Sequence, residues 1–139
     1  AIGIDIQQIQ WLAFVLAGLK AKPDLVILEL GANDMLRGLS PDQTRVNVDA
    51  VLAELKKRGI PVILAGMRAS PNMGKSYQAR FDPIFPALAK KHGARLYPFF
   101  MNGVTPNRSL LIADQMHPNA KGVAIIVKGI YPLVAAALR

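Results

Sequence analysis

The sequence predicts an α/β fold, a three-layer α/β/α sandwich with a parallel sheet. Segments of helical periodicity alternate along the chain with short, nearly continuous apolar runs, which is the pattern of such a fold. With 139 residues, 52% of them hydrophobic and 19% charged, the chain has enough apolar surface to offset the entropy of ordering. We therefore expect one folded domain over residues 1–139.

The first predicted helix begins near Asp5, which can cap it together with Gln8 three residues later. The helix should end between Gly18 and Lys22, because Pro23 disfavours helix at the residue before it. Its expected apolar face consists of Ile6, Ile9, Leu12, Ala13 and Leu16.

Three apolar runs predict the parallel strands. Residues 25–30, bounded by Asp24 and Gly31, form a nearly continuous run that is typical of a strand buried on both faces. The runs at residues 61–67 and 95–98 predict two further strands of the same sheet.

A second helix is expected between the first two strands. Ser40, Pro41 and Gln43 combine an N-cap serine, a proline at the first helical position and a capping-box glutamine. These residues predict a helix start, and Gly59 predicts its end. Its expected apolar positions are Val48, Val51, Leu52 and Leu55.

A third helix follows a loop at residues 68–75. Residues 77–89 have helical spacing, which Pro83 and Pro86 interrupt or kink before Gly93 closes the helix. The spacing therefore predicts a discontinuous helix before the third strand.

An irregular segment, residues 99–116, precedes the last helix, and a loop of that length is usually functional. Helical spacing resumes after His117 and Pro118 and continues to the C-terminus, with Pro132 expected to kink the last turns. The apolar positions of this helix are Val123, Ile126, Val127 and Ile130.

The formal charge of +8 raises the question of nucleic-acid binding. The basic clusters at residues 56–58 and 90–91 lie at expected helix C-termini, where cations complement the helix dipole, and no nucleic-acid-binding motif accompanies them. We interpret them as solvated helix ends and expect no specific nucleic-acid partner. His92, between Lys91 and Gly93, is likewise expected to be solvated.

The sequence also limits the membrane and redox properties of the chain. Its longest apolar stretch, residues 11–19, is shorter than the roughly 20 residues of a spanning helix, so we expect no membrane span. The N-terminus shows no signal pattern, which leaves bacterial cytoplasm and periplasm both open. Without cysteine there is no disulfide, thiolate site or cysteine nucleophile, and two histidines do not make a histidine-rich metal site.

Two polar groups fall where chemistry is expected, beyond the carboxyl ends of parallel strands. In the first, Gly31 lets the chain turn sharply and Asn33 presents its amide above the sheet. The alternative is that Asn33 and Asp34 form an ordinary turn, because both side chains bond nearby backbone.

The second group is residues 114–118. Asp114 lies three residues before His117, so its carboxylate can accept a hydrogen bond from Nδ1 and leave Nε2 free as a base. The alternative is that Asp114 caps the last helix and His117 is only a residue of its first turn.

Taken together, these motifs resemble the SGNH (GDSL-type) serine hydrolases, in particular the bacterial arylesterase and thioesterase I/lysophospholipase branch. The resemblance covers roughly residues 22–138, is weak over residues 1–21, and implies a flavodoxin-like topology that is incomplete at its N-terminus. Its motifs are Lys-Pro-Asp-Leu-Val-Ile-Leu-Glu-Leu-Gly-Ala-Asn-Asp (22–34), Gly-Met-Arg-Ala-Ser-Pro-Asn (66–72), Tyr-Pro-Phe-Phe (97–100) and Asp-Gln-Met-His-Pro-Asn-Ala-Lys-Gly (114–122).

The resemblance implies roles for individual residues. Asn33 would donate to an oxyanion hole beside Gly31, His117 would be the general base, and Asp114 would orient it. Such chemistry requires no metal or organic cofactor. Met35 and Met67 are weak candidates for an acyl pocket, and core filling is the alternative.

The family's Gly-Asp-Ser block is not recognisable here, so the nucleophile is expected from a segment outside this chain. Ser70, just after the second strand, is a weak substitute; the other serines are Ser40, Ser76 and Ser109. The resemblance implies hydrolysis of a small ester or thioester, and the alternative is an inactive remnant that acts as a binding or assembly module. Because the strand at 25–30 would then lack a neighbour, we expect a homo-oligomer, a dimer or higher.

Overall fold

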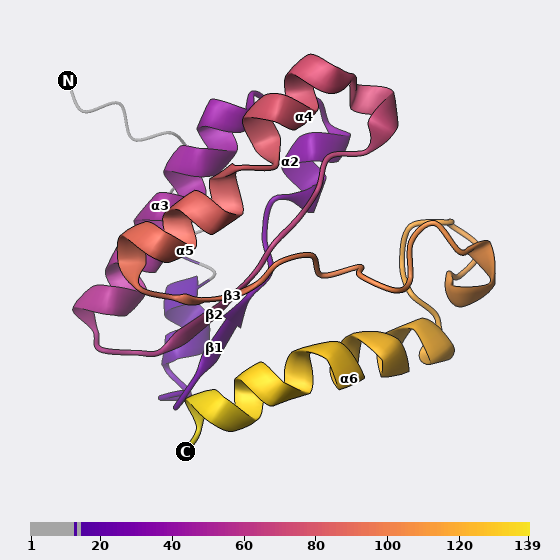
Figure 1. The fold of residues 1–139 in the computed structure, drawn as a ribbon. Coiled ribbons are helices and arrows are strands. Elements are labelled where there is room, and N and C mark those ends of the chain that lie inside the picture. Colours follow the sequence, from indigo (N-terminus) through magenta and orange to yellow (C-terminus); the bar gives the residue numbers. More distant parts are fainter. Residues whose placement is uncertain (1–12, 14) are drawn as a thin grey trace.

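A computed structural model describes residue 13 and residues 15–139, and these form an α/β structure with a parallel sheet (Figure 1). The elements in chain order are β1 (Val26–Leu28), α2 (Ala32–Leu36), α3 (Pro41–Lys57), β2 (Val62–Ala65), the 3₁₀ turn η1 (Pro71–Met73), α4 (Lys75–Phe81), α5 (Ile84–His92), β3 (Arg95–Tyr97), the 3₁₀ turn η2 (Arg108–Leu110) and α6 (Ala120–Ala137).

The three strands lie in the order β1-β2-β3, and both pairings are parallel, as predicted. Val26 pairs with Val62 at one end of the sheet, and Ala65 pairs with Tyr97 at the other. The ladder is shorter than the apolar runs predict, because the chain leaves it after residue 28 and turns at Gly31 into α2.

Helices cover both faces of this sheet, which confirms the three layers. Leu64 belongs to a core that α3 and α5 complete, whereas Ile63 packs on the opposite face with Tyr97 and with Ile130 of α6. Figure 1 shows α3 and α5 on one side of the strands and α6 crossing the other. Alternation of side chains along β2 therefore supplies both cores.

The predicted start of α3 is confirmed, but its capping box is wrong. Pro41 is the first helical residue, after Ser40, whose side chain makes no capping hydrogen bond. Ser40 Oγ instead accepts a hydrogen bond from Arg80, and Gln43 donates along the helix to Asn47. The fixed φ of the proline, rather than the serine side chain, is the local signal that holds.

The proline-interrupted helix divides as predicted. α4 ends at Phe81, α5 begins at Ile84, and Gly93 closes α5 with a left-handed conformation at φ 64°. Phe81 and Phe85 contact edge to face across this break, with ring centroids 5.5 Å apart. The aromatic contact joins the two short helices to each other, and both helices pack on α3.

His92 does not extend into solvent, which corrects the expectation for this residue. Its side chain is 9% exposed, and its Nε2 lies 2.5 Å from Oδ1 of Asp49 on α3. The two residues are 43 positions apart in the chain, so the contact arises from the packing of α5 on α3 and leaves no local sequence signal.

The N-terminal helix packs through a different face from the predicted one. Residues 15–19 are helical, and Val15 and Leu19 are buried while Leu16 is 36% exposed. Val15 and Leu19, one turn apart, join the core that contains Leu28 of β1. The expected positions Asp5, Ile6, Ile9 and Leu12 lie outside the described residues.

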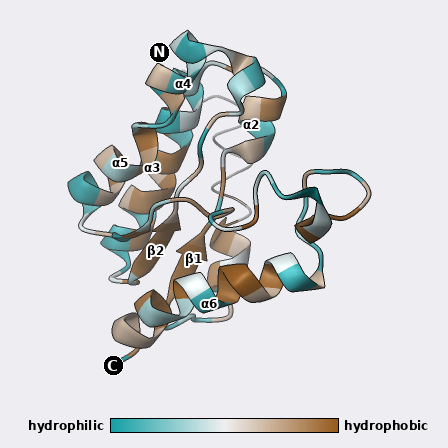
Figure 2. Cartoon of the chain, turned by 45° about the vertical axis from the view of Figure 1, so that its right-hand side comes forward, coloured by the Kyte–Doolittle hydropathy of each residue, from teal (hydrophilic) through white to brown (hydrophobic). Residues whose placement is uncertain are grey.

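α6 is more apolar than the prediction of no membrane span assumes. It is long and apolar enough to cross a membrane by length and composition alone, and only 17% of this 18-residue stretch is buried. In Figure 2 much of the α6 ribbon has the brown colour of hydrophobic residues. Ile126 and Ile130 are buried against the molecule, whereas Val123 and Val127 are 45% and 55% exposed.

Candidate active site

The loop before α6 brings Asp114 and His117 into direct contact. Oδ2 of Asp114 lies 2.5 Å from Nδ1 of His117, and Oδ1 accepts hydrogen bonds from the backbone amides of Met116 and His117 at 2.9 and 3.0 Å. The imidazole is therefore held at one nitrogen, and Nε2 is left for another partner.

The alternative role of Asp114, as the cap of the last helix, is wrong. α6 is capped by Asn119, whose side-chain oxygen accepts a hydrogen bond from the amide of Gly122 at 3.1 Å. The Ile112 amide also donates to the carbonyl of His117 at 2.9 Å, and Leu111 bridges to Pro118. The loop thus closes on itself before the helix begins and fixes the backbone on both sides of Asp114.

Hydrogen bonds to its charged form keep Asp114 ionised. The His117 amide, the His117 ring and the Met116 amide together lower the pKa of Asp114 to about 2. The side chain of His117 is 71% exposed. A carboxylate that stays charged beside an accessible imidazole can fix the tautomer of the ring and stabilise its protonated form.

The predicted group at residues 31–34 lies at the carboxyl end of β1, in the first turn of α2. Gly31 precedes the helix with φ 119°, and an added Cβ there would lie 3.3 Å from both Phe85 and Thr44. Asn33 is exposed, and within the described part of the chain its side-chain amide makes no hydrogen bond. The residues form a helical turn, so the alternative of a simple Asn-Asp turn is wrong.

Asp34, which the sequence suggested only as a turn residue, is buried and holds this helical turn against α3. It is 5% exposed, and Oδ2 accepts a hydrogen bond from the hydroxyl of Thr44 on α3 at 3.0 Å. Thr44 itself is fully buried. The contact ties α2, and with it Asn33, to the long helix beneath.

Glu29 is a residue that sequence reasoning missed. It lies between β1 and α2 and is partly buried, which raises its pKa, while the charge of His117 acts in the opposite direction. This interaction places the loop of His117 within electrostatic reach of the carboxyl end of β1. The available signal was a charged residue inside the apolar run 25–30.

The loop after β2 approaches α2 at the same end of the sheet, beyond the carboxyl ends of the strands. The Ser70 amide donates to Sδ of Met35 at 3.3 Å, and the Arg68 guanidinium lies 5.0 Å from the centre of the Phe99 ring. Met35 is partly buried at this junction, whereas Met67 is 8% exposed and belongs to the main core. Met67 is therefore positioned as a core residue.

None of the hydrogen bonds among the described residues joins a serine to His117. Ser70 donates to Asn72, Ser109 donates to Asn107, and Ser40 accepts from Arg80. Ser76 lies in α4. The described contacts thus orient the His117 imidazole and leave the Asn33 amide exposed, but none of them brings a serine hydroxyl to His117. In the described part of the chain there is also no group of three or more His, Asp or Glu side chains that could hold a metal ion.

Comparison with known proteins shows the family to which the chain is similar. The GDSL-like lipase/acylhydrolase family matches residues 3–125, so the similarity extends into residues 1–21, where only a weak resemblance was expected. An arylesterase of Vibrio mimicus is 38% identical over 96 residues, which are 69% of this chain and 48% of that protein. Thioesterase 1/protease 1/lysophospholipase L1 of Escherichia coli is 36% identical over 117 residues, which are 81% of this chain and 56% of that protein.

A solved structure gives the same result for the fold. The crystal structure of AlinE4, an esterase of the SGNH-hydrolase family, is 48% identical with a TM-score of 0.71, covering 94% of this chain and 69% of that one. The chain spans about half the length of the curated relatives that it matches.

Proposed function

The chain belongs to the GDSL-like lipase/acylhydrolase family, and on that basis we propose that it takes part in the hydrolysis of small carboxylic esters or thioesters by acyl transfer. The observation that carries the proposal is the hydrogen bond between Asp114 and Nδ1 of His117, which leaves Nε2 free at an exposed loop. The relatives named as esterases and a thioesterase support the substrate class.

In this proposal each residue of the candidate active site has a defined role. His117 Nε2 takes the proton of the attacking hydroxyl and later returns it to the leaving alcohol or thiol. Asp114 keeps the ring oriented and stabilises its charge. Asn33, beside Gly31, donates its amide to the oxyanion, and Met35 contributes to the wall of the acyl site.

The serine is the one part of this machinery that no described contact supplies. Ser70 is the serine at a strand end, and its hydroxyl is occupied by Asn72 rather than by an imidazole. This observation favours a second candidate function, in which the chain is an inactive remnant that serves as a binding or assembly module.

An ester hydrolase and an inactive remnant can be distinguished by labelling with a fluorophosphonate probe and by turnover of p-nitrophenyl acetate. An ester hydrolase labels at one serine, which mass spectrometry locates, and loses about 10²–10⁴-fold of its turnover with His117→Ala. Asn33→Ala should cost about 10²–10³-fold, whereas Asn102→Ala, in an exposed loop, should leave turnover unchanged. Because the nucleophile is expected from a segment outside this chain, the measurement includes a version extended at its N-terminus. If that folded, extended protein neither labels nor turns over, the hydrolase is contradicted and the remnant is supported.

A further inference from the structure

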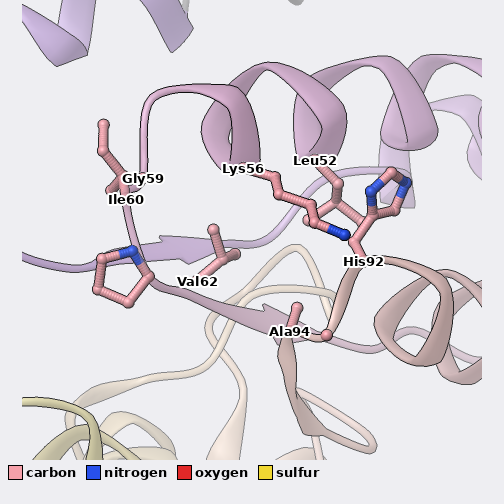
Figure 3. A pocket seen from close by; sticks show the side chains of 9 residues that line it. Leu52, Lys56, Gly59, Ile60, Val62, His92 and Ala94 are labelled. Carbon is pink, nitrogen blue, oxygen red and sulfur yellow. The ribbon is translucent and has the colours of Figure 1, made fainter.

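A cavity of about 240 Å³ lies at the end of the sheet opposite to the candidate active site (Figure 3). Its walls come from the segments that lead into β2 and β3, residues 59–62 and 93–94, and from the ends of α3 and α5. Asn33 instead follows the carboxyl end of β1, and His117 lies in the loop that leads from β3 to α6. The cavity is therefore separate from the proposed hydrolytic machinery.

Among the described residues that line the cavity, Lys56 is the basic side chain without a carboxylate partner. Both helices end in basic residues there, but Lys91 and His92 are taken up by Asp49, at 2.9 and 2.5 Å. Lys56 lines the cavity and, among the described residues, has no carboxylate within ion-pair distance. In Figure 3 its side chain extends over the cavity toward the ring of His92.

Asp49 does not repel an anion from this position. Burial opposes the ionisation of Asp49, but hydrogen bonds from His92 and Lys91 outweigh it and hold its pKa below the ordinary value. Its charge is thus matched by the groups that it binds. The His92 ring, 9% exposed and fixed at Nε2, forms a rigid wall of the cavity.

The remaining walls are apolar, which limits the kind of anion that fits. Leu52 and Val62 are 1% and 9% exposed, and Ile60, Pro61 and Ala94 complete the lining. A ligand needs one anionic group for Lys56 and an apolar body for these walls. The negative ends of the α3 and α5 dipoles also lie here. They oppose every anion, and they oppose a dianion such as phosphate more strongly than a monoanion.

From this combination we propose that the cavity binds a small monocarboxylate of about the size of benzoate. The carboxylate pairs with the ammonium group of Lys56, and the ring lies against Leu52, Val62 and Ala94. The volume suits such a ligand, because a cavity of about 150 Å³ already holds benzene. The site does not depend on the proposed hydrolase function, so each can fail without the other.

The test is a titration of the ¹⁵N-labelled chain with sodium benzoate, followed by amide chemical shifts. We expect saturable shifts at the amides of Gly59, Ile60, Gly93 and Ala94, and much weaker binding of the neutral isostere benzamide. Sodium phosphate at equal ionic strength should not reproduce these shifts. Equal binding of benzamide, equal shifts with phosphate, or the absence of saturable shifts would each overturn the proposal.

Two lysine variants distinguish binding of benzoate in the cavity from a general attraction of benzoate to a basic protein. Lys56→Met keeps the aliphatic stem and removes the charge, and it should weaken benzoate binding about fivefold. Lys57→Met removes the same charge one residue along but does not line the cavity, so it should change the Kd less than about twofold. Both variants are surface changes whose amide spectra also report folding. Equal affinities of the two variants would show that Lys56 does not bind the ligand.

Discussion

Oδ2 of Asp114 lies 2.5 Å from Nδ1 of His117, while Oδ1 of the same carboxylate accepts the His117 backbone amide at 3.0 Å. One side chain therefore holds both the ring and the main chain of a residue three positions later. Within the described part of the chain, this double contact holds the imidazole from its own loop, and it explains how an exposed loop can present the ring in a defined orientation.

The first prediction concerns the titration of Asp114. Because its pKa is lowered to about 2 from an ordinary value of 3.8, the contacts are fully present above pH 3.8 and are lost as the pH falls through 2. The carboxyl carbon of Asp114 and the amides of Met116 and His117 should therefore titrate together in NMR spectra, with a midpoint near pH 2. A midpoint near the ordinary value would show that the amides do not donate to this carboxylate. Asp114→Asn should abolish the transition at both amides.

The sequence predicted the fold well because its signals are local. Continuous apolar runs mark β2, Pro41 marks the start of α3, and Gly93 marks the end of α5. The contact between Asp114 and His117 could also be predicted from the sequence, because residues three apart in a turn lie close together.

The remainder could not be predicted because it depends on packing between distant segments. His92 meets Asp49 across 43 residues, and Asp34 meets Thr44 only once α2 lies on α3. Ser40 looked like a capping residue, yet its hydroxyl is engaged by Arg80, 40 residues away. In each case the residue type permits several hydrogen-bond partners, and the tertiary packing determines which partner the side chain has.

The second prediction concerns Glu29. Burial raises its pKa above 4.5, so the folded state binds a proton more tightly than the unfolded state, and stability falls as the pH rises through the folded pKa. Glu29→Gln should therefore stabilise the protein at pH 7, and the gain should disappear below pH 4.5. Urea unfolding at several pH values measures this. A gain that is independent of pH would contradict the burial argument. Glu54→Gln on α3 is the control and should give no such gain, because the hydrogen bond from Arg58 lowers the pKa of Glu54 instead of raising it.

The third prediction concerns the hydrogen bond between Thr44 and Asp34. Thr44→Val keeps the shape of the side chain but removes the hydroxyl that Asp34 accepts at 3.0 Å in a buried place. We expect a loss of about 1–3 kcal/mol in the free energy of unfolding. Thr105→Val, at an exposed position, should change it by less than about 0.5 kcal/mol. Similar losses for both variants would mean that the buried contact contributes nothing specific.

The fourth prediction concerns Gly66, where the loops after β2 and β3 meet. Its amide donates to Tyr97, its carbonyl accepts from Phe100, and an added Cβ would lie 2.3 Å from the carbonyl oxygen of Pro98. Since that neighbour is backbone, Gly66→Ala should cost roughly 2 kcal/mol or more, as seen in chemical denaturation. Gly18→Ala is the control, because nothing lies within 4 Å of the added Cβ and the residue is helical. If Gly66→Ala leaves the free energy of unfolding unchanged, the two loops can move apart without cost.

The last prediction concerns self-association through the edge of the sheet. Among the described residues β1 pairs only with β2, so its other edge presents backbone donors and acceptors without a neighbouring strand. Ile27 on this strand is 46% exposed, and the exposed apolar residues Val123 and Val127 lie on α6. An apolar strand edge of this kind favours pairing with a second chain, and a two-fold arrangement closes on itself.

We therefore expect a dimer in sedimentation velocity that dissociates on dilution, and a shift toward monomer with Ile27→Lys, because a charge on an edge strand opposes edge-to-edge pairing. Val46→Lys is the matched control: Val46 is a comparably exposed aliphatic residue, 44%, on α3 rather than at the sheet edge. If wild type remains a monomer at every concentration while the amides of residues 26–28 are protected from hydrogen exchange, the edge is already covered within one chain. In that case the N-terminal residues, which already contribute Val15 and Leu19 to the core beside Leu28, are the segment to examine by truncation.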